Sequence, residues 1–179
     1  MAKVVVFTGL PGTGKSTLAG YAADALQAPV LAWDWVMAAL RPYEGIQTAL
    51  AAMDGPTYVS VGWSVIWNLT IAQLRLGRSV VIDAVARQEQ LERTRAVAGE
   101  HRVPCLVVLT TCSEEELHRS RVEGRTRDIP GWHELDWDHV QGVKHRFPLL
   151  EGVDLTLDAV ASLEENRAAL RVLLGSDRP

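Results

Sequence analysis

One segment near the start of the chain limits the possible folds more than any other. It runs Gly9-Leu10-Pro11-Gly12-Thr13-Gly14-Lys15-Ser16 and fits G-x-x-x-x-G-K-[ST], the pattern of a phosphate-binding loop. Glycine has no Cβ, so the backbone at Gly9 and Gly14 can take left-handed angles and turn its N–H groups toward an anion. Lys15 then supplies positive charge to terminal phosphates, and the Ser16 hydroxyl suits Mg²⁺.

The segments on either side give this loop the setting that it needs. Residues 3–8 are apolar and mostly β-branched, as in a buried parallel strand, and residues 16–26 suit a helix. The N-terminus of that helix adds partial positive charge, whereas a plain glycine-rich turn would need neither Lys15 nor Ser16. We therefore expect seven residues to hold a nucleoside triphosphate: Gly9, Gly12, Thr13, Gly14, Lys15, Ser16 and Thr17.

Apolar runs that suit strands alternate along the chain with amphipathic runs that suit helices, which is typical of α/β proteins with a parallel sheet. The expected strands span residues 3–8, 29–33, 79–83, 104–111 and 153–157. The expected helices span residues 15–27, 34–41, 57–76, 87–101, 113–126, 136–146 and 161–174. The length, with no linker visible, predicts a single domain over residues 1–179.

The composition argues against several classes of protein. A net charge of −4 and a pI near 5.7 disfavour a nucleic-acid binder held by a broad basic face. No apolar run approaches the roughly 18 residues of a membrane-spanning helix, and no apolar signal region precedes the first strand. We therefore expect a cytoplasmic protein, with Cys105 and Cys112 reduced on one strand. The five histidines lack metal-ligand spacing, and we expect solvated positions for all of them: His101, His118, His133, His139 and His145.

Two aspartates follow expected strands, at the edge of a parallel sheet where ligands bind. Asp34 comes directly after the second strand, where a carboxylate can orient an acceptor hydroxyl and accept its proton. Asp34 also suits a helix N-cap, and one residue can serve both purposes. Asp83 ends the run Val80-Val81-Ile82-Asp83, a pattern typical of a carboxylate that holds Mg²⁺, although a structural aspartate at a strand end fits as well.

Arginines follow the fourth expected strand. Arg121 and Arg125 are four residues apart, which places both on one face of the expected helix, and Arg127 comes just after them. Planar guanidinium groups can stabilise the charge on a phosphoryl group during transfer. The other interpretation is a solvated face in which glutamates pair with the arginines, and it is strongest for Arg119.

Aromatic side chains are the other candidates for a small-molecule site. Trp35 follows Asp34, and Trp63 and Trp67 lie one helical turn apart, so that all three can line a pocket for the acceptor or fill the core. Arg41 and Arg87 are further candidates for contact with the acceptor, because each follows one of the two aspartates at the sheet edge.

The chain resembles small P-loop kinases in four features: the quoted loop, Asp34, the strand that ends at Asp83 and the Arg121–Arg125 pair. This class includes adenylate, shikimate and gluconate kinases, chloramphenicol phosphotransferase, zeta toxins and polynucleotide kinase domains. The resemblance implies a three-layer fold with strand order 2-3-1-4-5 and a lid over residues 121–135. In that class the first arginine packs on the nucleotide base and the second contacts phosphates. An aspartate that matches Asp34 serves there as general base.

The resemblance thus implies an ATP- and Mg²⁺-dependent phosphotransferase that acts on a hydroxyl of a small molecule. Lys15, Asp34, Arg121 and Arg125 would be its catalytic residues, and Ser16 and Asp83 would position Mg²⁺. The acceptor region, residues 28–77, holds few charges, which argues against a phosphorylated acceptor. Three alternatives remain open: a 5′-hydroxyl polynucleotide kinase, a nucleoside or nucleotide kinase, and a nucleotide-dependent switch or ATPase module that works through a protein partner.

Overall fold

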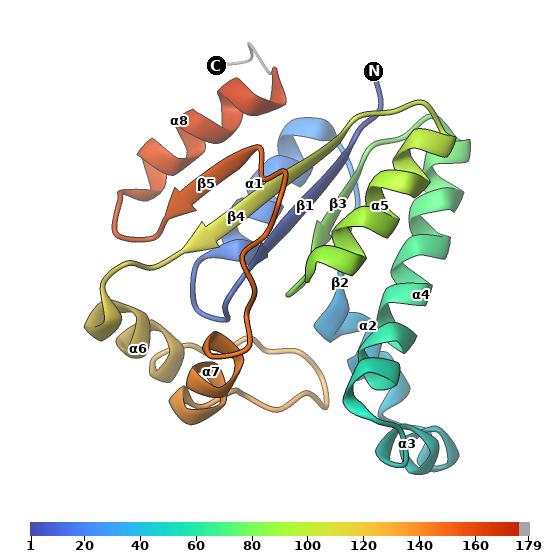
Figure 1. Cartoon of the computed structure of the whole chain (residues 1–179), viewed down its shortest axis with the longest axis vertical. Coiled ribbons are helices and arrows are strands. Elements are labelled where there is room, and N and C mark those ends of the chain that lie inside the picture. The colour runs from blue at the N-terminus through green and yellow to red at the C-terminus, as the bar shows by residue number, and fades with distance from the viewer. Residues whose placement is uncertain (176–179) are drawn as a thin grey trace.

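A computed structural model of the chain describes residues 1–175, and the last four residues of the expected domain lie outside them. Its centre is a five-stranded sheet in the order β2-β3-β1-β4-β5, with every neighbouring pair parallel (Figure 1). The strands are β1 Val4–Gly9, β2 Val30–Ala32, β3 Val80–Asp83, β4 Cys105–Thr111 and β5 Leu155–Asp158. The predicted fold class and strand order are therefore confirmed.

Helices cover both faces of this sheet, which explains why β1 is buried along its whole length. Successive side chains of a strand point to opposite faces. Val4 and Val6 accordingly pack with residues of α4 (Gly55–Arg75) and α5 (Gln88–Glu100), whereas Val5 and Phe7 pack with residues of α1 (Lys15–Leu26) and α8 (Leu163–Leu174). The two apolar clusters give the three layers seen in Figure 1.

The remaining helices gather beyond the carboxyl ends of the strands, in the lower part of Figure 1. They are α2 Trp33–Leu40, α3 Glu44–Ala51, α6 Glu115–Glu123 and α7 Trp137–Lys144. The segment 124–136 joins α6 to α7 and reaches across toward α2. No helix within residues 1–175 combines the length and the apolar character needed to span a bilayer.

Several boundaries differ from those expected. The sequence predicts no helix in residues 42–54, but the structure has α3 there. Leu50 is its single buried residue, so the apolar pattern of this helix is weak. The helix expected over 113–126 ends at Glu123, because Gly124 closes its last turn with an N–H bond to the Ser120 carbonyl. Arg125 therefore lies outside α6, and the inference that it shares a helix face with Arg121 is wrong.

Candidate functional site

The glycine-rich loop between β1 and α1 has the backbone that its sequence predicts. Gly9, Gly12 and Gly14 all have positive φ, at 137°, 85° and 86°. A Cβ at Gly9 would lie 2.1 Å from the carbonyl oxygen of Thr110, and a Cβ at Gly12 would lie 2.6 Å from Val122 Cγ2. Glycine is thus required here both by the backbone angles and by the close approach of β4 and α6.

Buried polar side chains from other elements hold this loop in place. The hydroxyl of Thr13 lies 2.7 Å from that of Thr110 and donates to the Leu10 carbonyl at 2.7 Å. The His118 ring nitrogen Nε2 lies 2.7 Å from the Pro11 carbonyl oxygen, and the residue is 2% exposed. The expectation of a solvated position is therefore wrong for His118. The periodicity of α6 offered a signal, since His118 and Val122 are four residues apart on its buried face.

Lys15 is buried at the start of α1, and its ammonium group donates to the Leu10 carbonyl at 2.8 Å. Burial lowers the pKa of Lys15 to about 8, although the carboxylates of Asp83 and Asp34 act in the opposite direction. The positive charges of Arg125 and Arg127 lower it further. Two carboxylates and two guanidinium groups therefore lie close enough to Lys15 for their charges to change its pKa.

Asp83 ends β3 beside β1, with its Cα opposite that of Phe7. Burial raises the pKa of its carboxyl group, while Lys15 and a hydrogen bond from Ser16 lower it. A carboxylate beside a hydroxyl suits Mg²⁺, which keeps several waters and takes other oxygen ligands from phosphates. Residues 1–175 contain no group of three His, Cys, Asp or Glu side chains arranged to hold a metal ion, so such an ion would rely on those other ligands.

Asp34 lies in the first turn of α2. The sequence predicts a helix that begins at Asp34, but β2 ends at Ala32 and α2 begins one residue earlier, at Trp33. The N-cap of α2 is Ala32, so the alternative of a capping role for Asp34 is wrong. Its carboxylate oxygen Oδ2 instead accepts a hydrogen bond from Nη1 of Arg127 and forms an ion pair with it.

Arg125 and Arg127 differ sharply in their partners. Nε and Nη2 of Arg125 are buried and have no hydrogen-bond partner within the part of the chain that the structure describes. Burial lowers the pKa of Arg125, and the neighbouring charge of Arg127 lowers it further. All three guanidinium nitrogens of Arg127, in contrast, donate to oxygen atoms of Asp34, His133 and Glu134. An anion near Lys15 would supply the partner that Arg125 lacks.

The tryptophans expected at the acceptor site divide into two groups. Trp63 is 0% exposed and Trp67 donates from Nε1 to Thr94 at 3.0 Å, so both pack within the core between α4 and α5. The expectation that Trp63 lines an open pocket is therefore wrong, and Trp67 likewise faces α5. Trp35 is 53% exposed at the start of α2.

Arg41 and Arg87 follow the two aspartates as the sequence indicated, but in different surroundings. Arg41 ends α2, and its guanidinium group lies 4.9 Å from the ring centre of Trp132 and 3.1 Å from His133 Nδ1. Arg87 is the N-cap residue of α5, where its N–H donates to Gln90 Oε1 at 3.0 Å. Trp132 and His133 were not recognised from the sequence, because the loop pattern of residues 127–135 carries no periodicity that would place them.

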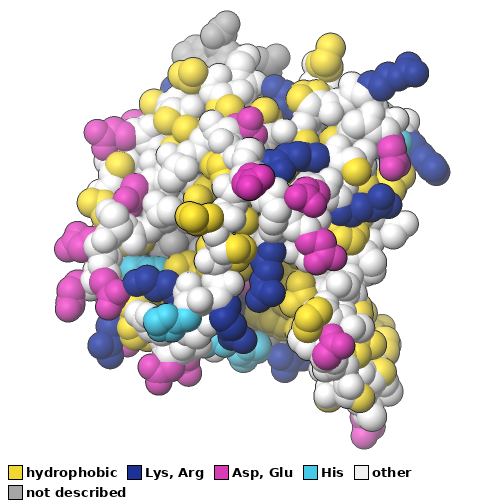
Figure 2. Space-filling view, viewed as in Figure 1, with side chains coloured by type: hydrophobic (Ala, Val, Ile, Leu, Met, Phe, Trp, Pro, Cys, Tyr) yellow, Lys and Arg dark blue, Asp and Glu magenta, His cyan; other side chains and the backbone are white. Residues whose placement is uncertain are grey.

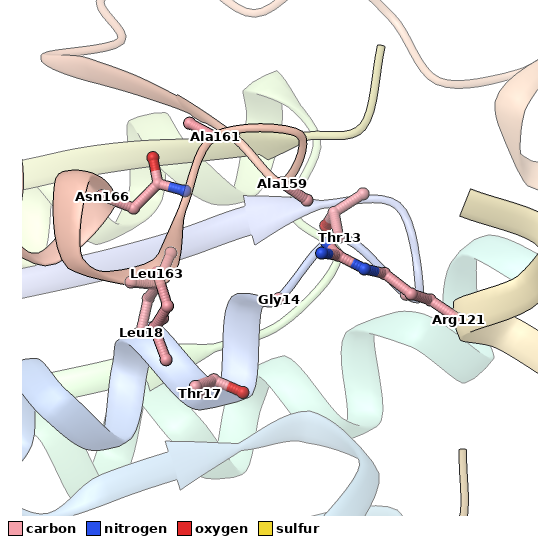
Figure 3. Close-up of a pocket in the computed structure, with 10 residues that line it drawn as sticks. Thr13, Gly14, Thr17, Leu18, Arg121, Ala159, Ala161, Leu163 and Asn166 are labelled. Atoms are coloured by element: carbon pink, nitrogen blue, oxygen red, sulfur yellow. The ribbon is translucent and has the colours of Figure 1, made fainter. Parts of the chain in front are cut away.

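A cavity of about 260 Å³ adjoins the loop, and Gly12, Thr13, Gly14 and Thr17 line one part of it. Figure 3 shows Arg121 reaching from α6 toward Thr13, while Ala159, Ala161, Leu163 and Asn166 come from the segment after β5 and from α8. Asn166 is itself oriented by a 2.8 Å hydrogen bond to the Asp158 carbonyl. The cavity thus combines an arginine, a buried amide and apolar atoms next to the phosphate-binding loop.

The surface around these residues is uneven in charge. Figure 2 shows Lys, Arg and His side chains interspersed with Asp and Glu in the lower left part of this face, around α6 and α7, whereas the region of α3 at the lower right shows mostly uncharged and apolar side chains. The basic side chains near the site are thus accompanied by acidic ones, since residues 115–144 contain five Lys or Arg and seven Asp or Glu.

A family model described as "AAA domain" matches residues 4–150, which include the loop, both aspartates and the three arginines. The chain belongs to this family. Comparison of the sequence with curated proteins gives no match.

Solved structures similar to this chain include several small kinases. A sugar kinase from Janibacter sp. has a TM-score of 0.72 at 17% identity and covers 99% of this chain and 96% of its own. A gluconokinase from Sinorhizobium meliloti has a TM-score of 0.65 at 19% identity, with 99% and 98% covered. An APS kinase from Mycobacterium tuberculosis, solved with AMPPNP and APS, has a TM-score of 0.62 at 20% identity, with 98% of each chain covered. These similarities confirm the fold that the resemblance to small P-loop kinases implied.

Proposed function

We propose that this protein is an ATP- and Mg²⁺-dependent kinase that transfers the γ-phosphoryl group to a hydroxyl group of a small molecule. The observation that carries the proposal is a pair of cations whose charges act on each other, the buried Lys15 of the loop and the half-buried Arg125 that follows α6. Arg125 has buried nitrogens without a partner among residues 1–175, and burial lowers the pKa of both groups. Buried charge of this kind is stabilised by a bound anion, and the adjoining glycine loop is shaped for phosphates.

The residues take distinct roles in this proposal. The loop from Gly9 to Thr17 binds the triphosphate through its N–H groups, and the cavity beside Arg121 takes the nucleoside. Ser16 and Asp83 would hold Mg²⁺, which would neutralise part of the negative charge on the phosphates. Lys15 and Arg125 stabilise the phosphoryl group as it moves.

Asp34 acts in this scheme as the general base on the acceptor side. The negative charge of Asp34 raises the pKa of Lys15. The Asp34 side chain is 36% exposed despite its ion pair with Arg127. An exposed carboxylate near the γ-phosphate can orient an acceptor hydroxyl and accept its proton as the oxygen attacks phosphorus. Trp35, the residue after Asp34 on α2, and Arg41, the C-cap residue of α2, are the proposed contacts for the rest of the acceptor.

Small-molecule acceptors agree best with the surroundings. The names of the similar sugar kinase, gluconokinase and APS kinase all denote small-molecule acceptors. A nucleic-acid strand would need a continuous basic groove, whereas exposed apolar side chains, Tyr43 and Met53, flank the two ends of α3.

A screen of hydroxyl compounds tests the proposal by following ATP loss above the background rate. With an accepted compound, Asp34→Asn should lower transfer by about 10²- to 10⁴-fold, while affinity for MgATP stays unchanged. The exposed Asp24→Asn on α1 is the matched control and should keep wild-type rates.

Three outcomes would contradict parts of the proposal. A folded protein that does not bind MgATP would exclude the kinase altogether. Wild-type transfer by Asp34→Asn would remove the base assignment. Turnover that begins only when a protein partner or a nucleic-acid 5′ end is added would favour one of the other interpretations of the sequence.

A further inference from the structure

We infer that Arg127 is a positioning residue that holds Asp34 in the orientation needed to accept the proton, and that it does not contact the phosphates. The inference rests on the proposed role of Asp34 as general base. It goes beyond that role because it gives the two neighbouring arginines, Arg125 and Arg127, different functions.

Arg127 is anchored by its own segment before it reaches Asp34. Its backbone N–H donates to Glu134 Oε1 at 2.8 Å, and its Nε donates to Glu134 Oε2 at 3.1 Å. Nη2 donates to the carbonyl oxygen of His133 at 2.8 Å. The bonds from Nε and Nη2 fix the plane of the guanidinium group, and the backbone bond holds Glu134 in place for one of them, so that only Nη1 is directed at Asp34.

The carboxylate of Asp34 is therefore engaged through one oxygen only. Oδ2 accepts from Arg127, and Oδ1 has no hydrogen-bond partner among residues 1–175. The Asp34 side chain is 36% exposed and that of Arg127 only 15% exposed. A hydroxyl group can thus approach Oδ1 while Arg127 remains in place, and the held carboxylate presents that oxygen in a fixed direction.

Arg125 provides the contrast on the same segment. Two of its guanidinium nitrogens are buried without partners in the described chain, whereas every guanidinium nitrogen of Arg127 is already used. A phosphate placed against Lys15 can therefore bind Arg125 without breaking existing bonds, but binding to Arg127 would require it to release Asp34, Glu134 or His133.

A double-mutant cycle separates the two roles. We expect Arg127→Met to lower kcat by about 10- to 100-fold, with nucleotide affinity and the KM for ATP unchanged, because an ill-positioned base slows only the transfer step. In an Asp34→Asn background, the same substitution should change the single-turnover rate by less than about twofold, because the residue through which it acts is gone. Arg125→Met is the matched control, and it should lower the rate in both backgrounds and weaken ATP binding.

The result that would overturn the inference is an equal loss of rate from Arg127→Met in both backgrounds, or a loss of ATP affinity. Arg127→Lys adds a second criterion. It keeps the positive charge, but a single nitrogen cannot contact Asp34, Glu134 and His133 in the same geometry, so we expect it to be as slow as Arg127→Met. Full activity of Arg127→Lys would point to a purely electrostatic role and contradict positioning.

Hydrogen exchange tests the anchor without any activity. In the substrate-free protein, Glu134→Ala should speed exchange of the Arg127 amide at least tenfold, whereas Glu123→Ala, on the exposed end of α6, should leave it unchanged. Unchanged exchange in Glu134→Ala would contradict the anchor. Normal protection in a protein that phosphorylates no hydroxyl compound would instead show that the proposed function has failed while the contacts of Arg127 are correct.

Discussion

The two sides of the candidate site are held together in different ways. On the nucleotide side, buried hydrogen bonds join the loop to neighbouring elements. Thr13 contacts Thr110 of β4, and His118 of α6 contacts the Pro11 carbonyl. On the acceptor side, long side chains bridge α2 and the segment 124–136, as in the Arg127–Asp34 ion pair and the stacking of Arg41 on Trp132.

Because of this difference, the contacts on the nucleotide side are part of the folded core, whereas those on the acceptor side can change without unfolding the protein. Buried hydrogen bonds between strand, loop and helix are lost only with large cost, because the unsatisfied groups stay buried. Partly exposed ion pairs and cation–π contacts contribute little to folding stability. Substitutions on the nucleotide side should therefore disturb stability and ATP binding together, whereas those on the acceptor side should alter transfer alone.

Lys15→Ala should give the largest effect on activity. It is an exception on the nucleotide side, because we do not expect it to lower stability. We expect turnover to fall by roughly 10³-fold, because a charge aimed at the transferred group is removed. The buried ammonium disfavours the folded nucleotide-free protein at pH 7, since its pKa is lowered to about 8 from 10.5. The melting temperature should therefore stay the same or rise, as scanning calorimetry can measure. A fall of several degrees would contradict the assigned burial of the charge.

Gly9→Ala should produce the next largest effect, this time on folding. Its Cβ would lie 2.1 Å from the backbone oxygen of Thr110 at a φ of 137°, so we expect the free energy of unfolding to fall by about 3 kcal/mol or more. Gly14→Ala is the matched control, because its φ is 86° but nothing lies within 4 Å of the added atom, and about 1 kcal/mol is expected. Urea denaturation midpoints measure both. Equal losses would show that backbone angle alone decides.

Most of the nucleotide side follows from the sequence, because its signals are local. The loop pattern, the apolar strand before it and the helix after it lie within residues 3–26, and Asp83 ends a strand whose neighbour is β1. Parallel order then brings the carboxyl ends of these strands together. The spacing of His118 and Val122 on α6 could indicate that His118 is buried, but its contact with the Pro11 carbonyl, 107 residues away, has no signal in the sequence.

The acceptor side was predicted less well, because its contacts join residues far apart through a loop without periodicity. Nothing local in the sequence indicates that Arg127 would pair with Asp34, 93 residues earlier. The tryptophans show a similar limit. Their helical spacing is the same whether they face a pocket or the core, so only the position of α5 decides that Trp63 and Trp67 are packed against it.

The pH dependence of kcat/KM for ATP is a smaller effect that again reports on the nucleotide side. Lys15 must be positively charged to attract the phosphates, and its pKa in the free protein is about 8. We expect kcat/KM to fall about tenfold per pH unit above pH 8, because the neutral amine accumulates there. The kcat profile should bend at a higher pH, since bound phosphates raise the pKa of Lys15. A flat kcat/KM profile to pH 10 would contradict the assigned burial of Lys15.

His118→Gln should have the smallest effect of these substitutions, and it tests whether the loop depends on its supports from α6. His118 is buried and contacts the Pro11 carbonyl, so a shorter, reoriented amide should weaken that contact and raise the KM for ATP by about 5- to 10-fold, equivalent to roughly 1 kcal/mol. Arg119→Ala, the next residue, is the matched control. It loses only an exposed ion pair with Glu123 and should bind ATP normally. Equal KM values in the two variants would mean that the loop keeps its shape without α6, and that the buried hydrogen bonds of the nucleotide side matter less than their burial suggests.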